Sequence, residues 1–317
     1  MRPTLVALMS AMLAAFAFQA AHAQSSPPAA VIADPPADKA HPAAMAYVRV
    51  PSHGALMNGV MYAASGPGPH PTVLLLHGFP GNEQNLDLAQ AMRRAGFNVL
   101  TFHYRGAWGS PGAFSFANAI EDADAAVAFL RDPRVAARFG VDEKRLFVAG
   151  HSMGGYMAAS ATAHDPAVAG LIMISAWNIG PASQAFHDPK AREAAKEGEF
   201  AEDTIPLAGT STDTLMDEAM NHPSWAFAAL APALGARPVL LITAEDGSFA
   251  ASHELSQKLP HATEVHMDTD HPFSDHRIAL QTVVVNWLEQ RAGAAALSGF
   301  RSNRLIGEPD EHGRLGD

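Results

Sequence analysis

A serine lies in the most distinctive short pattern of the chain. Residues 150–154 read Gly-His-Ser-Met-Gly, so Ser152 has a glycine two positions away on each side. An apolar run at 146–149 precedes the pattern, and small residues with helical spacing follow it. A buried strand, a tight turn and a helix in that order are what a nucleophilic serine requires, because the turn presents the hydroxyl at the edge of a sheet. The alternative interpretation is a glycine-rich loop with a capping serine.

A serine hydroxyl is a weak nucleophile near neutral pH and works only with further groups. It needs an adjacent general base, and the base needs a carboxylate that orients it. The oxyanion that forms during acyl transfer needs hydrogen-bond donors that are already in position. The backbone N–H of Met153 is one candidate donor, because it directly follows Ser152 at the start of a predicted helix, where the helix dipole favours an anion.

Two further stretches, together with the serine pattern, resemble the α/β-hydrolase family. They are 74–81, LLLHGFPG, and 104–112, YRGAWGSPG, and the resemblance extends over roughly 46–291. The second stretch looks most like the dienelactone-hydrolase and prolyl-oligopeptidase-like branch. The resemblance implies an α/β fold class, namely an α/β-hydrolase fold with a mostly parallel central sheet flanked by helices and a helical cap insertion.

In this family the acid follows the serine along the chain and the histidine comes last. The resemblance therefore points to Asp246, in the loop after an apolar strand predicted at 239–243. That position is where functional groups gather in parallel sheets, at the carboxyl ends of strands. Glu245 is the alternative acid, one position earlier, and an ordinary turn aspartate is the other interpretation of Asp246.

The predicted catalytic histidine is His271. It lies in 268–274, DTDHPFS, which is similar to the histidine loop of the family. His276 competes with it from the start of the last predicted helix. His266 falls inside the last predicted strand, so we expect it to be a packed side chain. His151, beside the serine, is expected to shape the turn and not to act as the base.

The resemblance also implies a second oxyanion donor and a neighbouring brace. The His-Gly loop at 77–81 indicates the N–H of Phe79, because Pro80 has no N–H; a plain strand-to-loop turn is the alternative. Arg105 is expected to brace the loops through Asp122 or Asp124, since its planar fork suits fixed ion pairs; substrate binding is the alternative.

Several aromatic residues are candidates for an apolar substrate pocket, although each alone is more often a core residue. We predict substrate binding by Trp177 and Trp225, with Trp108, Phe114 and Phe249 as further candidates.

Strands and helices alternate along most of the chain, which predicts a mostly parallel sheet with helices on both faces. The expected strands are 46–50, 55–63, 72–76, 97–102, 146–149, 171–175, 239–243 and 264–267, and the expected helices are 83–95, 116–130, 250–259 and 276–291.

One segment, 177–232, interrupts this alternation. It is far longer than an ordinary connection between two strands. It holds a predicted charged helix at 189–202, a loop and a second apolar stretch at 225–230. We expect it to be a cap over the site, the alternative being a peripheral insertion without contact to substrate.

The composition excludes several classes of function. The chain has 317 residues, 48% of them hydrophobic, and a net charge of −11, which argues against nucleic acid or an anionic membrane surface as partner. It contains no cysteine, so disulfides, thiolate metal sites and a cysteine nucleophile are excluded. We expect neither a metal nor an organic cofactor, and the oligomeric state is not predicted.

The two ends of the chain read as segments outside the domain. Residues 1–23 have the basic start, apolar run and small-x-small end of a signal peptide, which predicts a periplasmic or secreted protein with no membrane span after cleavage. A retained anchor is the alternative. Residues 24–43 are predicted to be a flexible leader, 44–297 the hydrolase domain, and 298–317 a loose tail.

Together these features predict an exported serine hydrolase that cleaves small carboxylic esters through Ser152, His271 and Asp246 and an acyl-enzyme. A peptidase or amidase of the prolyl-oligopeptidase-like type would use the same three side chains and is the alternative. A hydrolase-fold protein that binds without catalysis is a more remote alternative, since it would usually lack one of the three.

Overall fold

Continuous apolar runs form the central strands of the sheet. The structure, a computed structural model, describes residues 26–293. In β6 (Gly170–Ile174) and β7 (Val239–Thr243) every residue is buried. In β3 (His70–Leu76), Leu74 and Leu76 join the apolar cluster on one face, while the alternate residues join the cluster on the other face. This alternation follows from the period of two in a strand, and burial on both faces is typical of parallel strands.

The eight strands of the sheet have the order β1-β2-β4-β3-β5-β6-β7-β8. β1 (Ala44–Ser52) and β2 (Ala55–Ala63) form an antiparallel hairpin at one edge, and β2 is antiparallel to β4 (Asn98–Phe102). All other pairs are parallel, including those of β5 (Val141–His151) and β8 (Ala262–His266). The predicted fold class is therefore confirmed.

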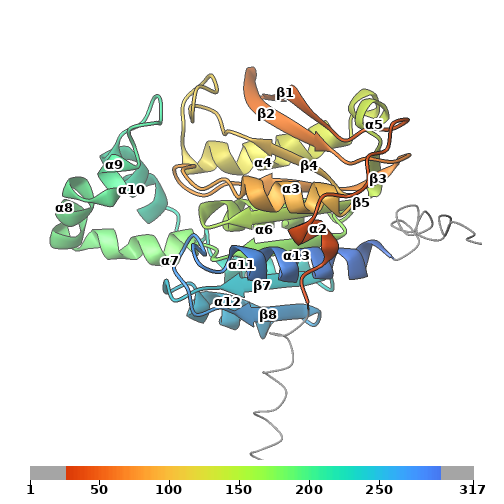
Figure 1. Ribbon diagram of the computed structural model, residues 1–317. Helices are drawn as coiled ribbons and strands as arrows, with labels where there is room; N and C mark the ends of the chain where they lie inside the picture. The colour runs from red at the N-terminus through yellow and green to blue at the C-terminus, as the bar shows by residue number, and fades with distance from the viewer. Residues whose placement is uncertain (1–25, 294–317) are drawn as a thin grey trace, which may run out of the picture.

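Helices cover both faces of the sheet (Figure 1). α4 (Phe116–Leu130), α6 (Met153–His164) and α11 (Phe227–Leu234) contribute to one apolar cluster. α3 (Leu86–Arg94) and α13 (Arg277–Ala292) contribute to the other. Two shorter helices complete the layers, α5 (Pro133–Phe139), which the sequence analysis missed, and α12 (Phe249–Ser256). Among residues 26–293, we find no helix with the length and apolar character that a membrane span requires.

The segment between β6 and β7 is helical, and several of its helices stand together to one side of the sheet (Figure 1). The single helix predicted at 189–202 is two helices, because the chain is extended at Gly198 (φ −112°). The stretch predicted as a loop contains a further helix, which Ser211 caps by accepting a hydrogen bond from the Thr214 N–H. The helices of the segment are α7 (Ile179–Ser183), η2 (Gln184–His187), α8 (Pro189–Glu197), α9 (Glu199–Glu202), α10 (Thr212–Met220) and α11.

The described part of the leader is not wholly flexible, which corrects the prediction for 24–43. Residues Ala29–Ile32 form a helical turn, α2, between prolines. Val31 is buried with 5% of its surface exposed, in the cluster shared with α3 and α13. Arg94 donates from Nε to the carbonyl of Ala30 at 2.6 Å. The buried Val31 and the Arg94 hydrogen bond together attach this stretch to the domain. The predicted signal peptide at 1–23 and tail at 298–317 lie outside the described residues.

Candidate active site

Ser152 occupies a tight turn between β5 and α6. Its φ is +56°, a left-handed conformation that few non-glycine residues adopt. A Cβ added at Gly150 would lie 1.9 Å from the carbonyl oxygen of Gly154, and one at Gly154 would lie 2.3 Å from that of Leu76. Real Cβ atoms do not approach so closely, so the two glycines around the serine are sterically required. The sequence pattern predicted this turn.

Asp246 and His271 are brought together from two loops at the carboxyl edge of the sheet. Asp246 follows β7, and its Oδ2 lies 2.5 Å from Nδ1 of His271, in the loop after β8. The Ser248 N–H donates to Asp246 Oδ1 at 2.9 Å. Burial alone would raise the pKa of the Asp246 carboxyl, but the hydrogen bonds from His271 and Ser248 outweigh it and hold that pKa well below its usual range. Asp246 is therefore charged at neutral pH.

Glu245, the alternative acid, points elsewhere. Its Oε1 lies 2.8 Å from Nε2 of His266, on the edge strand β8. The prediction that His266 is a packed side chain is wrong, because β8 is an edge strand and this imidazole is 35% exposed.

The His77–Gly81 loop lies against the serine. A Cβ placed at Gly78 would lie 2.9 Å from the Cβ of Ser152 and 3.4 Å from its Oγ. Among the described residues, no group accepts a hydrogen bond from the backbone N–H of Phe79 or of Met153. Both predicted donors are therefore available.

Two histidines, His77 and His103, form a hydrogen-bonded pair that contacts the backbone of this loop. His77 is buried, and burial lowers its pKa to about 3, so the ring is neutral. Its Nδ1 lies 2.7 Å from the carbonyl oxygen of Gly78, which assigns the proton to Nδ1. Nε2 then accepts from Nδ1 of His103 at 3.3 Å. Trp108 adds a bond from Nε1 to the carbonyl of Pro80 at 2.9 Å. No pattern in the sequence indicates this contact of His103.

His151 connects the serine turn with the histidine loop. Its Nε2 lies 3.0 Å from the carbonyl oxygen of His271, and the two rings are 4.6 Å apart between centroids. Burial, and then the neighbouring His271, lower the pKa of His151 to about 4, so it donates as a neutral ring. Within residues 26–293, Ser152 Oγ makes no hydrogen bond with the His271 ring. Such bonds often tighten only when substrate binds.

Arg277, at the start of α13, joins the histidine loop to the start of α3, which follows the His-Gly loop. Its Nη1 donates to the carbonyl of Pro272 at 2.7 Å, its Nη2 to Asn85 Oδ1 at 3.0 Å, and its Nε to Asp87 Oδ2 at 2.8 Å. Asp87 and Arg277 are 190 residues apart, so no local pattern in the sequence signals this link.

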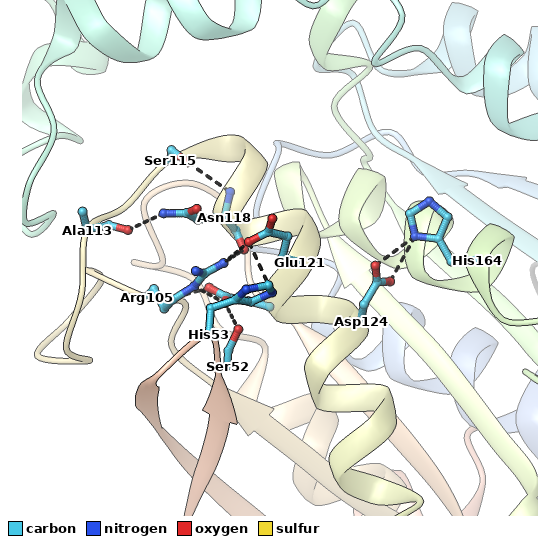
Figure 2. A network of polar contacts seen from close by, with 10 residues as sticks. Ser52, His53, Arg105, Ala113, Ser115, Asn118, Glu121, Asp124 and His164 are labelled. Carbon is cyan, nitrogen blue, oxygen red and sulfur yellow. Dashed lines mark hydrogen bonds and ion pairs between the residues drawn. The ribbon is translucent and has the colours of Figure 1, made fainter.

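Arg105 braces the loop after β4 (Figure 2). Figure 2 shows it directed at Glu121, and its Nη2 lies 2.6 Å from Glu121 Oε2. Its Nε lies 2.5 Å from Oδ1 of the fully buried Asp122. The predicted pair with Asp122 is confirmed, whereas Asp124 lies 2.9 Å from Nδ1 of His164 instead, and Figure 2 shows that pair apart from the network.

The inserted segment contacts the loop after β4 and the His-Gly loop beside Ser152. Ala208 donates to the carbonyl of Gly106 at 2.7 Å and accepts from the Phe114 N–H at 2.9 Å. Phe200, in α9, stacks on Phe79 with ring centroids 5.1 Å apart. The segment therefore packs against the His-Gly loop and the loop after β4, and whether it covers a bound substrate stays a prediction.

The two tryptophans predicted to bind substrate have different neighbours, and their role stays a prediction. The Trp177 N–H donates to the carbonyl of Ser152 at 2.9 Å, and its half-buried ring packs against Phe116. Trp225 lies in the insertion, where it stacks on His222 at 4.1 Å.

The family described as serine aminopeptidase, S33, matches residues 67–223 of the chain. The fold described above is the α/β-hydrolase fold. The chain belongs to the α/β-hydrolase family. With the family match, the fold makes it a serine hydrolase of the α/β type. No curated protein matches the sequence.

Solved structures with this fold include the 2,6-dihydroxy-pseudo-oxynicotine hydrolase, at a TM-score of 0.60 and 18% identity, with 81% of this chain and 70% of that chain covered. The hyperthermophilic esterase from the archaeon Pyrobaculum calidifontis has a TM-score of 0.58 and 20% identity, over 80% of this chain and 88% of that chain. EstE1, a thermophilic carboxylesterase from a metagenomic library, has a TM-score of 0.57 and 22% identity, over 82% of this α/β-hydrolase and 90% of its own length.

Proposed function

We propose that the protein cleaves small carboxylic esters, with Ser152 as nucleophile, His271 as general base and acid, and Asp246 as the acid that orients the imidazole. The observation that carries the proposal is the 2.5 Å contact between His271 Nδ1 and Asp246, next to a strained serine turn. An imidazole whose Nδ1–H is held by a charged carboxylate presents Nε2 as a base.

In the first half of the reaction, Ser152 Oγ attacks the ester carbonyl carbon and its proton passes to His271 Nε2. The N–H groups of Phe79 and Met153 donate to the carbonyl oxygen as it becomes an anion. The C–O bond then breaks, and His271 gives its proton to the departing alcohol oxygen. In the second half, water attacks the acyl-enzyme, its proton passes through His271 to Ser152 Oγ, and the carboxylic acid leaves.

The test compares wild type with Ser152→Ala on ethyl acetate in a pH-stat. We expect Ser152→Ala to lower kcat by roughly three or more orders of magnitude, as removal of a nucleophile does. Thr162→Ala, a buried hydroxyl on the same helix without a hydrogen-bond partner among the described residues, is the matched control and should retain most activity. Equal turnover by wild type and Ser152→Ala would refute the proposal.

A peptidase is the second candidate, and the match to a family described as serine aminopeptidase favours it. The same nucleophile would attack an amide, whose nitrogen must be protonated before it leaves. Comparing p-nitrophenyl acetate with aminoacyl p-nitroanilides separates the two. Turnover of the anilides without turnover of the ester would reverse the assignment.

We also propose export to the periplasm or medium, which rests on the signal-like pattern at 1–23. N-terminal sequencing of the protein recovered outside the cytoplasm should begin at Gln24. Recovery of the uncleaved chain in the cytoplasm would contradict export.

A further inference from the structure

Five aromatic rings form a continuous line from the inserted segment to the serine turn, and a sixth packs beside it. Successive ring centroids are 5.7 Å apart for Phe186 and Phe200, 5.1 Å for Phe200 and Phe79, 5.7 Å for Phe79 and Phe116, and 5.5 Å for Phe116 and Trp177. Phe114 packs beside Phe79 at 5.9 Å. We call this set the aromatic wall; its members are Phe79, Phe114, Phe116, Trp177, Phe186 and Phe200.

The aromatic wall reaches the two segments that carry the reacting groups of the proposed function. The Trp177 N–H bonds to the backbone carbonyl of Ser152, and the Phe79 N–H is a proposed oxyanion donor. Phe79 directly follows Gly78, where an added Cβ would lie 3.4 Å from Ser152 Oγ. A substituent of an ester bound at Ser152 can therefore reach the Phe79 end of the wall.

Part of the aromatic wall is exposed, which distinguishes it from ordinary core packing. Phe114 and Phe116 are buried, with 2% and 0% of their surface exposed, and form its rigid base. Phe79, Trp177, Phe186 and Phe200 are only partly buried. Exposed aromatic faces beside a nucleophile can bind a further ring by stacking or edge-to-face contact.

The inserted segment that carries Phe186 and Phe200 is acidic. Residues 177–232 contain nine Asp or Glu and three Lys or Arg, and Glu199, Glu202 and Asp203 are the sequence neighbours of Phe200. Arg192 is paired with Asp213 and Asp217, and Lys196 with Asp213, whereas Lys190 has no ion pair among the described residues. The excess of acidic residues disfavours a substrate with a negative charge.

We propose, on the basis of the function proposed above, that the preferred substrates are esters that carry an aromatic ring and no negative charge, and that the ring binds on the aromatic wall. Phe200 and Phe186 then determine specificity from the insertion.

The experiment compares substrates that differ only in aromaticity. One pair is methyl phenylacetate and methyl cyclohexylacetate, and the other is benzyl acetate and cyclohexylmethyl acetate. In at least one pair, the wild-type kcat/KM for the aryl ester should exceed that for its cyclohexyl partner by roughly threefold to tenfold, the gain expected from one aromatic contact. Methyl (4-carboxyphenyl)acetate should have a kcat/KM about tenfold below methyl phenylacetate, because like charges repel it.

Phe200→Leu and Phe186→Leu should reduce the aryl-to-cyclohexyl ratio toward one, since leucine keeps apolar area but has no ring. Phe139→Leu is the matched control: Phe139 is also half-buried, but it lies at the amino end of β5, and its variant should keep the wild-type ratio. If either Phe200→Leu or Phe186→Leu fails to fold, the other variant and the wild-type ratios still test the inference.

Ratios near one in both wild-type pairs would overturn the inference, as would an unchanged ratio in both variants. If ester hydrolysis depends on Ser152 but shows no aryl preference, this inference alone fails. If hydrolysis does not depend on Ser152, the proposed function fails and the inference fails with it.

Discussion

At the residue scale, Arg277 illustrates how one side chain holds two loops of the site in register. It contacts Pro272 beside His271, and Asn85 and Asp87 beyond the His-Gly loop. The Asn85 side chain is buried, so water cannot fully replace the hydrogen bond that Arg277 donates to its Oδ1.

Replacing Arg277 by leucine should therefore destabilise the protein by about 1–3 kcal/mol, because it leaves the buried Asn85 Oδ1 without its donor. Urea unfolding at neutral pH measures the effect. Arg134→Leu is the control, since the Arg134 side chain is 92% exposed, and it should change stability little. Equal midpoints for the two variants would show that the Arg277 contacts do not stabilise the fold.

At the element scale, the join between β5 and α6 depends on glycines that let α6 approach β3. An added Cβ at Gly154 would lie 2.3 Å from the Leu76 carbonyl oxygen and 2.5 Å from that of His77. Both oxygens are backbone atoms at the start of the His-Gly loop, so they cannot rotate away as a side chain could.

Gly154→Ala should thus push α6 away from β3, displace the His-Gly loop and lower both stability and ester turnover. Gly68→Ala is the matched control, because its Cβ would meet nothing nearer than 3.4 Å. Thermal unfolding together with kcat/KM provides the measurement. Wild-type values for Gly154→Ala would contradict the steric account.

Local patterns in the sequence predict the strands, helices and turn that bring the site residues together. The serine turn, the apolar strands and the helix at 116–130 follow from glycine spacing, continuous apolar runs and helical periodicity. The sequence does not decide whether Glu245 or Asp246 faces His271, because a one-residue difference within a loop depends on tertiary contacts. The links through Arg277 and Phe200 depend on distant segments, so no local pattern could have revealed them.

At the scale of the whole molecule, two buried histidines make stability depend on pH. Burial lowers the pKa of His77 to about 3 and that of His151 to about 4, from 6.5. The folded chain keeps both rings neutral, while the unfolded chain binds protons as pH falls through 6.5. The unfolded state then binds more protons than the folded state, so the free energy of unfolding falls as pH drops from 6.5 toward 4.

Urea midpoints should accordingly be constant above pH 7 and decrease between pH 6.5 and 5, a window above the range where carboxylates with lowered pKa values titrate. Burial raises the pKa of Asp203 to about 6, so this carboxyl binds a proton in the folded chain and offsets part of the decrease caused by the two histidines. His151→Gln keeps a donor near the His271 carbonyl but cannot bind the proton, so its midpoint should decrease less steeply over that window. A slope equal to that of wild type would exclude His151 as a source of the acid sensitivity.

The central claim is that His271, held by Asp246, makes Ser152 reactive, and covalent labelling tests it most directly. A fluorophosphonate probe should label wild type at one residue, which peptide mass spectrometry should locate at Ser152. His271→Ala should reduce the labelling rate by roughly a thousandfold, because it removes the base. Labelling at another residue, or at the wild-type rate in His271→Ala, would contradict the account.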